Sequence, residues 1–194
     1  MRMKIEEHLS GHIDALTLVR RELTVAIGDC AALLIEALRQ GNKILIMGNG
    51  GSAADAQHFA AELVGRFLRN RQALPAVALT TDTSILTAVG NDFGYDEIFK
   101  RQVEALARPG DVVIGISTSG HSNNVFYALT AANQLGCKTV GLLGRDGGNI
   151  GGIVDLNLTV PSQETPFIQE AHVTIIHILC LLAENAMAES AKNV

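Results

Sequence analysis

The segment Lys43–Glu62, KILIMGNGGSAADAQHFAAE, decides the fold of this chain. Its apolar first part ends at a glycine cluster, and an alanine-rich helical pattern begins at once. This order predicts a strand, a tight turn and the start of a helix. Glycines let backbone N–H groups approach a ligand closely, and the positive end of a helix dipole favours an anion. The segment therefore predicts an anion-binding turn at the end of a strand.

Two reactive side chains follow this turn. His58 and Glu62 are four residues apart, so both project from one face of the predicted helix. Such a pair suits either acid–base chemistry or metal binding, and the spacing alone does not choose between them.

The composition favours one folded domain. Of the 194 residues, 47% are apolar and 18% are charged, which excludes a disordered chain and allows a sizeable core. The formal net charge of −5 argues against a broad basic surface, so we expect no nucleic-acid partner.

The cysteines and the N-terminus indicate a cytoplasmic protein. Cys30, Cys137 and Cys180 are far apart and form no C-x-x-C, so we expect neither a disulfide nor a thiolate metal site. The first twelve residues contain charged and histidine side chains where a signal peptide needs an apolar run. No apolar run approaches the roughly 18–20 residues of a membrane span, so we expect no membrane partner.

The rest of the chain alternates between strand and helix patterns. The predicted strands are 43–47, 76–79, 111–116, 138–143 and 154–160. The predicted helices are 5–39 with a break at Gly28-Asp29, 52–68, a short helix from the cap region 80–84 to 89, 96–106, 124–135 and 165–188. This order predicts an α/β fold, a doubly wound five-stranded parallel sheet flanked by helices.

The helical segment before the first strand is longer than one sheet face requires. It either forms a subunit interface or packs as a helical pair on its own sheet. We favour the interface, which makes it an N-terminal helical oligomerisation segment.

A second polar turn follows the third predicted strand. It reads Ser117-Thr-Ser-Gly-His-Ser-Asn-Asn124, and four hydroxyls converge where a helix begins. Hydroxyls and free N–H groups bind phosphate without Lys or Arg, whereas a simple N-cap would use only one hydroxyl. Both polar turns lie at strand C-termini, where ligands bind in such sheets, so we expect them to face one cleft. Neither a full dinucleotide G-x-G-x-x-G nor a phosphate-loop Gly-Lys-Ser/Thr is present.

Three further features allow two interpretations each. Asn91 and Asp92, within 90–95, belong either to a turn or to a hydroxyl-binding site. The arginines between 66 and 71 form either a solvated helix end or a contact with substrate or subunit. On the last predicted helix, Gln169 and His177 interrupt the apolar face eight residues apart. A lone histidine there is more often a core residue than a ligand.

The motifs, taken together, resemble a known family. The G-x-S-T-S-G-x-S-x-N pattern at 115–124 resembles the sugar-isomerase (SIS) domain. Five more segments together resemble the phosphoheptose isomerases: 49–52, 58–66, 90–94, 146–148 and 168–172. The resemblance implies a single SIS domain over 1–194, with interface helices at 1–40 and a sugar-phosphate-binding core at 41–190.

This resemblance also implies a reaction and an assembly. The family converts D-sedoheptulose 7-phosphate to D-glycero-D-manno-heptose 7-phosphate through an enediol, the first step toward ADP-heptose for lipopolysaccharide. It forms homotetramers with sites between subunits, and many members bind one Zn²⁺ per subunit.

Matching positions imply the site residues. The metal ligands would be His58, Glu62, Gln169 and His177. Glu62 would be the general base and His177 the general acid. The implied substrate contacts are Asn49, Gly50, Gly51, Glu62, Asn91, Asp92, Ser117, Thr118, Ser119, Ser122 and Gln169.

Two alternatives and one departure stay open at this point. A non-catalytic SIS relative binds the bacterial replication initiator, but it lacks the acid and imidazole found here at Glu62 and His177. An isomerase of another phosphosugar is the second alternative. Pro166 and Phe167 stand where relatives often carry polar residues, which puts substrate contacts from that segment in doubt.

Overall fold

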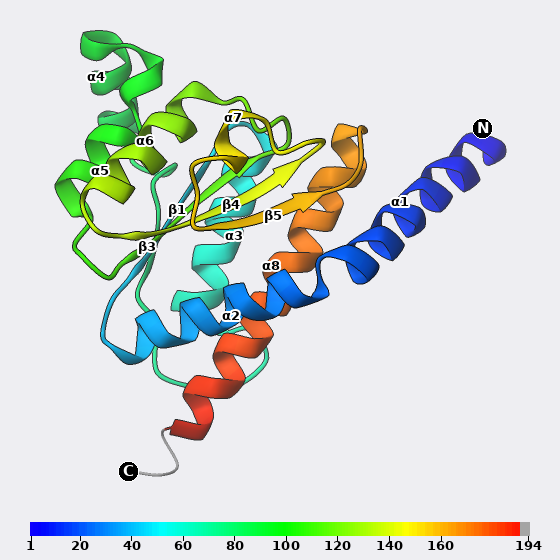
Figure 1. Cartoon of the computed structure of the whole chain (residues 1–194), viewed down its shortest axis with the longest axis horizontal. Helices are drawn as coiled ribbons and strands as arrows, with labels where there is room; N and C mark the ends of the chain where they lie inside the picture. Colours follow the sequence, from blue (N-terminus) through cyan, green and yellow to red (C-terminus); the bar gives the residue numbers. More distant parts are fainter. Residues whose placement is uncertain (191–194) are drawn as a thin grey trace.

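The structure, a computed structural model, describes residues 1–190. Its helices are α1 (Arg2–Glu22), α2 (Thr24–Arg39), α3 (Gly51–Val64), α4 (Thr83–Phe93), the 3-10 helix η1 (Tyr95–Glu97), α5 (Lys100–Leu106), α6 (Asn123–Gln134), α7 (Gly148–Gly151) and α8 (Thr165–Ser190). Its strands are β1 (Ile44–Gly48), β2 (Ala76–Ala78), β3 (Val112–Ser117), β4 (Lys138–Gly144) and β5 (Leu156–Val160). Figure 1 shows their arrangement.

The five strands form one parallel sheet in the order β2-β1-β3-β4-β5. The predicted doubly wound α/β fold is therefore confirmed. The chain moves outward in one direction from β1 to β2 and in the other from β3 to β5. In such sheets the crevice beyond the reversal point receives the ligand, so the turns after β1 and β3 lie at its two sides.

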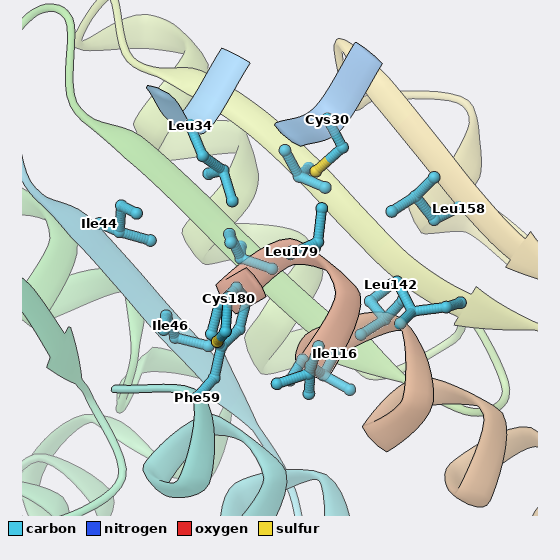
Figure 2. Close-up of a cluster of buried hydrophobic side chains, with 14 of the residues drawn as sticks. Cys30, Leu34, Ile44, Ile46, Phe59, Ile116, Leu142, Leu158, Leu179 and Cys180 are labelled. Atoms are coloured by element: carbon cyan, nitrogen blue, oxygen red, sulfur yellow. The ribbon is translucent and has the colours of Figure 1, made fainter. Parts of the chain in front are cut away.

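Both faces of the sheet are covered by helices (Figure 1). Neighbouring residues of a strand point to opposite faces, so Ile44 and Ile46 pack with α2, α3 and α8, while Leu45 and Met47 pack with α5 and α6. Figure 2 shows the first of these layers, in which Phe59 of α3 and Leu179 of α8 meet the strand side chains. This explains why the central strands are apolar without alternation.

The N-terminal helices differ from the prediction at their junction. They meet at Leu23, whose backbone is near-helical (φ −111°, ψ −3°), and not at Gly28-Asp29. Ile27 and Cys30 are buried on either side of the expected break. Their packing keeps the chain helical through Gly28, despite the entropy cost of glycine in a helix.

Three other helix boundaries were predicted wrongly. Helix α3 ends at Val64 and not near residue 68. The helix expected to end at 89 continues through residues 90–93 and ends where Gly94 takes a φ of +93°. The expected helix 96–106 is divided into η1 and α5. A glycine with positive φ stops a helix firmly, whereas the glycine at position 90 has an ordinary helical backbone.

Helix α8 also corrects the expectation about membrane spans. Its segment Thr165–Ala188 is long and apolar enough to cross a bilayer by length and composition. However, Ile168, Ile175, Ile176 and Leu179 are buried in the core of the molecule. The helix therefore has the composition of a span because it is the central helix of one layer.

Candidate active site

Helices α3 and α8 bring three potential ligands together. The Nε2 atoms of His58 and His177 lie 3.2 Å apart, and His58 Nε2 lies 3.1 Å from Glu62 Oε1. One ligand atom from each of the three side chains lies within 4.8 Å of the others, and all three side chains are half-buried. His58 and Glu62 share one helix face, and α8 places His177 opposite them. The structure thus joins the predicted pair to the predicted imidazole.

This cluster fits a divalent metal. Two imidazole nitrogens facing each other at 3.2 Å cannot both carry a proton at that position, so at least one presents a lone pair. Two imidazoles and a carboxylate are the donor set that Zn²⁺ takes in many catalytic sites. No other such group of His, Cys, Asp and Glu occurs within residues 1–190.

Gln169 lies near the N-terminal ends of the same two helices, α3 and α8. A Cβ built on Gly51 would lie 2.1 Å from Gln169 Nε2, so the amide packs directly on the first turn of α3. Gly51 faces Gln169 while His58 faces His177, which means that α3 and α8 run parallel across the site. The predicted fourth ligand therefore lies between the same two helices, toward their N-terminal ends, and the absence of a side chain at Gly51 leaves room for its amide.

Asp55 is a site residue that the sequence interpretation missed. It lies between Gly51 and His58 on α3, and only 6% of its surface is exposed. Burial raises the pKa of Asp55 to about 6, while hydrogen bonding with the Gln169 side chain and the charge of His58 oppose the rise. The spacing 55, 58, 62 was the available signal, since it continues the helix face of the reactive pair.

The loop after α3 packs against the cluster through Phe67. Glu184 of α8 is fully buried and accepts hydrogen bonds from the backbone N–H groups of residues 67–69. These bonds hold the Phe67 ring 5.4 Å from the His177 ring. Arg71 pairs with Glu184 and donates to the carbonyls of Glu62 and Leu63 at the end of α3. For Arg71 the expectation of a solvated helix end is therefore wrong.

The hydroxyl turn between β3 and α6 is folded on itself. Ser117 Oγ lies 2.9 Å from Ser122 Oγ and 3.5 Å from Ser119 Oγ, and it accepts from the backbone N–H of Gly120. Ser122 is the N-cap residue of α6, yet its side chain makes no capping bond. The capping alternative is therefore wrong. The hydroxyls face one another beside an uncapped helix start, and Thr118 lies between them, half-buried.

Glycines of the next loop hold this turn in place. A Cβ on Gly120, which has a φ of +69°, would lie 2.2 Å from the carbonyl oxygen of Gly147. A Cβ on Gly148 would lie 2.5 Å from the carbonyl oxygen of Gly120. The Gly147-Gly148 motif thus allows two loops to touch through their backbones, which explains a motif whose role the sequence left unassigned.

The Asn49 side chain is engaged with protein groups. Its amide and that of Asn124 exchange two hydrogen bonds of 2.9 Å, and the Tyr95 hydroxyl donates to Asn49 Oδ1 over 3.0 Å. This network ties the turn after β1 to the start of α6 and to η1. Asn49 therefore offers a ligand its backbone more readily than its side chain, while Gly50 and Gly51 beside it are exposed.

Asn91 and Asp92 are the predicted contacts that the structure does not bring to the cluster. Both are exposed on α4, and Asn91 Nδ2 donates to Asp92 Oδ1. Within residues 1–190 they form no hydrogen bond with the other predicted site residues. Helix α4 has no buried residue and projects from the body of the molecule (Figure 1).

Comparisons with known proteins identify the family of this chain. The SIS domain model matches residues 9–144. The chain is 68% identical to a phosphoheptose isomerase of Syntrophotalea carbinolica, over 90% of this chain and 89% of that one. It is 62% identical to the Geobacter metallireducens phosphoheptose isomerase, over 96% and 99% of the two chains.

A solved structure gives the same result at the level of the fold. The phosphoheptose isomerase GmhA from Neisseria gonorrhoeae superposes with a TM-score of 0.91 at 45% identity, covering 95% of this chain and 98% of that one. The match includes both helices that carry the cluster and both polar turns, because it spans nearly the whole chain. The chain therefore belongs to the phosphoheptose isomerase family of SIS-domain proteins.

Proposed function

We propose that the protein converts D-sedoheptulose 7-phosphate to D-glycero-D-manno-heptose 7-phosphate through an enediol intermediate. The observation that carries the proposal is the meeting of Glu62 and His177 from two helices within one small cluster. A carboxylate and an imidazole that face the same space are the acid–base pair that a ketose–aldose isomerisation needs. Relatives at 62–68% identity over most of their length carry the corresponding name.

In this proposal the two polar turns bind and orient the sugar phosphate. The hydroxyls of Ser117, Ser119 and Ser122 and the free N–H groups of α6 hold the phosphate. Thr118 and the exposed glycines at 50–51 add contacts along the chain of the sugar. Glu62 moves the proton between C1 and C2, and His177 protonates or polarises the adjacent oxygen. Asn91 and Asp92 contribute only if α4 approaches the ligand.

We further propose that His58, Glu62, Gln169 and His177 hold one Zn²⁺. The fit rests on the converging donors described above, with the Gln169 amide at their edge. A bound cation supplies positive charge that stabilises an enediolate. A carboxylate has two oxygens, so Glu62 can bind a cation through one and accept the proton with the other.

The assembly and the setting are also proposals. The exposed apolar side chains of α1 support a homotetramer in which residues 1–40 form a subunit interface and residues 41–190 the binding core. We place the enzyme in the cytoplasm, at the first step toward ADP-heptose for lipopolysaccharide.

Incubation of the purified protein with sedoheptulose 7-phosphate, with and without added Zn²⁺, tests the proposal. We expect the aldose phosphate to accumulate, and faster with metal. Absence of aldose under both conditions, with ligand binding retained, would instead favour the non-catalytic SIS alternative. Faster turnover of another ketose phosphate would favour an isomerase of different specificity.

A further inference from the structure

Asp55 is a buried acid with one unpaired oxygen. Its Oδ2 atom is buried and has no hydrogen-bond partner among the described residues. A buried carboxylate oxygen that lacks a partner costs folding free energy, so an apolar residue at position 55 would carry a smaller cost. This cost in folding free energy indicates that Asp55 is kept for a role in the site.

The neighbours of Asp55 indicate its role in the site. Residues 51, 55, 58 and 62 form one stripe along α3, and the Gln169 amide packs on the Gly51 end of it. The Gln169 side chain is also close enough to Asp55 to lower the pKa of its carboxyl, against the effect of burial. Asp55 therefore lies between the amide and His58, at the border of the cluster.

The amide of Gln169 must be oriented if it is to bind a cation. Its carbonyl oxygen has lone pairs for a metal, whereas its NH₂ group is only a donor. A carboxylate only accepts hydrogen bonds, so the oxygens of Asp55 suit the NH₂ group of Gln169 and not its carbonyl oxygen. This preference turns the carbonyl oxygen of Gln169 away from Asp55.

We propose that Asp55 is a positioning residue that binds the NH₂ group of Gln169 and so turns its carbonyl oxygen toward His58, Glu62 and His177. This inference rests on the proposed metal centre. It also gives a physical reason for the use of an amide, an uncommon zinc ligand, at this position.

Metal affinity of the metal-free protein is the direct test. We expect Asp55→Asn to weaken Zn²⁺ binding about ten- to a hundred-fold, because an amide at position 55 accepts either orientation of Gln169. Affinity is measured by competition with a chromophoric chelator, and the visible spectrum of the Co²⁺-loaded protein reports the donor set. The melting temperature should stay the same or rise, because a buried charge is removed.

A double-mutant cycle separates orientation from charge. In the Gln169→Glu background either carboxylate oxygen can face the metal, so orientation no longer requires a partner. Adding Asp55→Asn there should leave Zn²⁺ affinity unchanged or improve it, since it removes carboxylate–carboxylate repulsion. An equal loss of affinity in both backgrounds would overturn the inference and make Asp55 a direct ligand or a source of charge.

A matched control variant separates a loss of stability from a loss of Zn²⁺ affinity. Asp111 is another buried aspartate, bonded to Lys43 away from the site, and Asp111→Asn should lower the melting temperature without changing Zn²⁺ affinity. If the unsubstituted protein binds no Zn²⁺, the metal centre and this inference fail together. If it binds Zn²⁺ and Asp55→Asn binds it equally well with an unchanged Co²⁺ spectrum, only this inference fails.

Discussion

His172 is a histidine whose protonation opposes folding. It is fully buried, and its Nε2 lies 2.8 Å from the carbonyl oxygen of Leu143, so Nε2 carries the proton and donates it. Its Nδ1 is buried without a partner. Burial lowers the pKa of His172 to about 4, although the bond to Leu143 acts in the opposite direction. His172 is thus a core histidine, the alternative that the sequence interpretation considered for His177 on the same helix.

The unfolded chain therefore binds more protons than the native protein between about pH 6.5 and 4. Stability should fall as the pH falls through this window, by up to about 3 kcal/mol for a shift from 6.5 to about 4. Urea unfolding at pH 7, 5.5 and 4 measures it. His172→Gln keeps a donor for Leu143 but does not titrate, so this variant should lose less stability. An unchanged pH dependence in His172→Gln would contradict the account, and the exposed His121→Asn serves as control.

The end of α3 and the middle of α8 are joined by the buried Arg71–Glu184 pair. Glu184→Ala leaves the Arg71 charge and the N–H groups of residues 67–69 without their acceptor. We expect a loss of about 3–5 kcal/mol in the free energy of unfolding. The partly exposed pair of Glu97 and Lys100 provides the comparison, and Glu97→Ala should cost less than about 1 kcal/mol. Equal losses in the two variants would show that the buried pair contributes no more to the free energy of unfolding than the Glu97–Lys100 pair.

The elements show which features of the fold a sequence can predict. The central strands were located well, because β1 and β3 are continuous apolar runs and β4 is apolar after its first two residues, and all three end in Gly or Ser. The two polar turns follow from the same patterns. Helix ends were located less well, because they depend on distant partners. Glu184 binds the backbone N–H groups of the loop that follows Val64, where α3 ends. Buried neighbours keep α2 helical at Gly28.

The candidate site was predictable only in part for a similar reason. His58 and Glu62 share a helix face, which spacing reveals. Asp55 continues that face, so its spacing was also a signal. His177 and Phe67 belong to the site because α3 and α8 pack in parallel, which no local pattern predicts. The engagement of the Asn49 side chain with Asn124 and Tyr95 was equally invisible, since it joins three separate segments.

The whole molecule leaves an apolar stripe uncovered on α1. Ile5, Leu9 and Ile13 are 55%, 55% and 62% exposed and recur every four residues, so they lie on one face. Helix α1 extends beyond the body of the molecule (Figure 1), which leaves this stripe free for other copies of the chain. The proposed tetramer buries it.

A charge within the stripe should therefore break the assembly. We expect Leu9→Glu to reduce the mass measured by light scattering, while Asp14→Ala, on another face of α1, leaves it unchanged. The circular dichroism of both variants should indicate an intact fold. A monomeric mass for the unsubstituted protein would remove the interface role of residues 1–40.

The central claim is that Glu62 transfers the proton between C1 and C2 of a bound sugar phosphate. Glu62→Gln tests it most directly, with sedoheptulose 7-phosphate turnover followed by NMR and affinity measured by calorimetry on the same preparation. We predict that kcat falls at least about 10²–10⁴-fold, whereas the fold and phosphosugar affinity are kept, because the phosphate turn is untouched. A variant that binds the substrate and turns it over at a near-normal rate would contradict the claim.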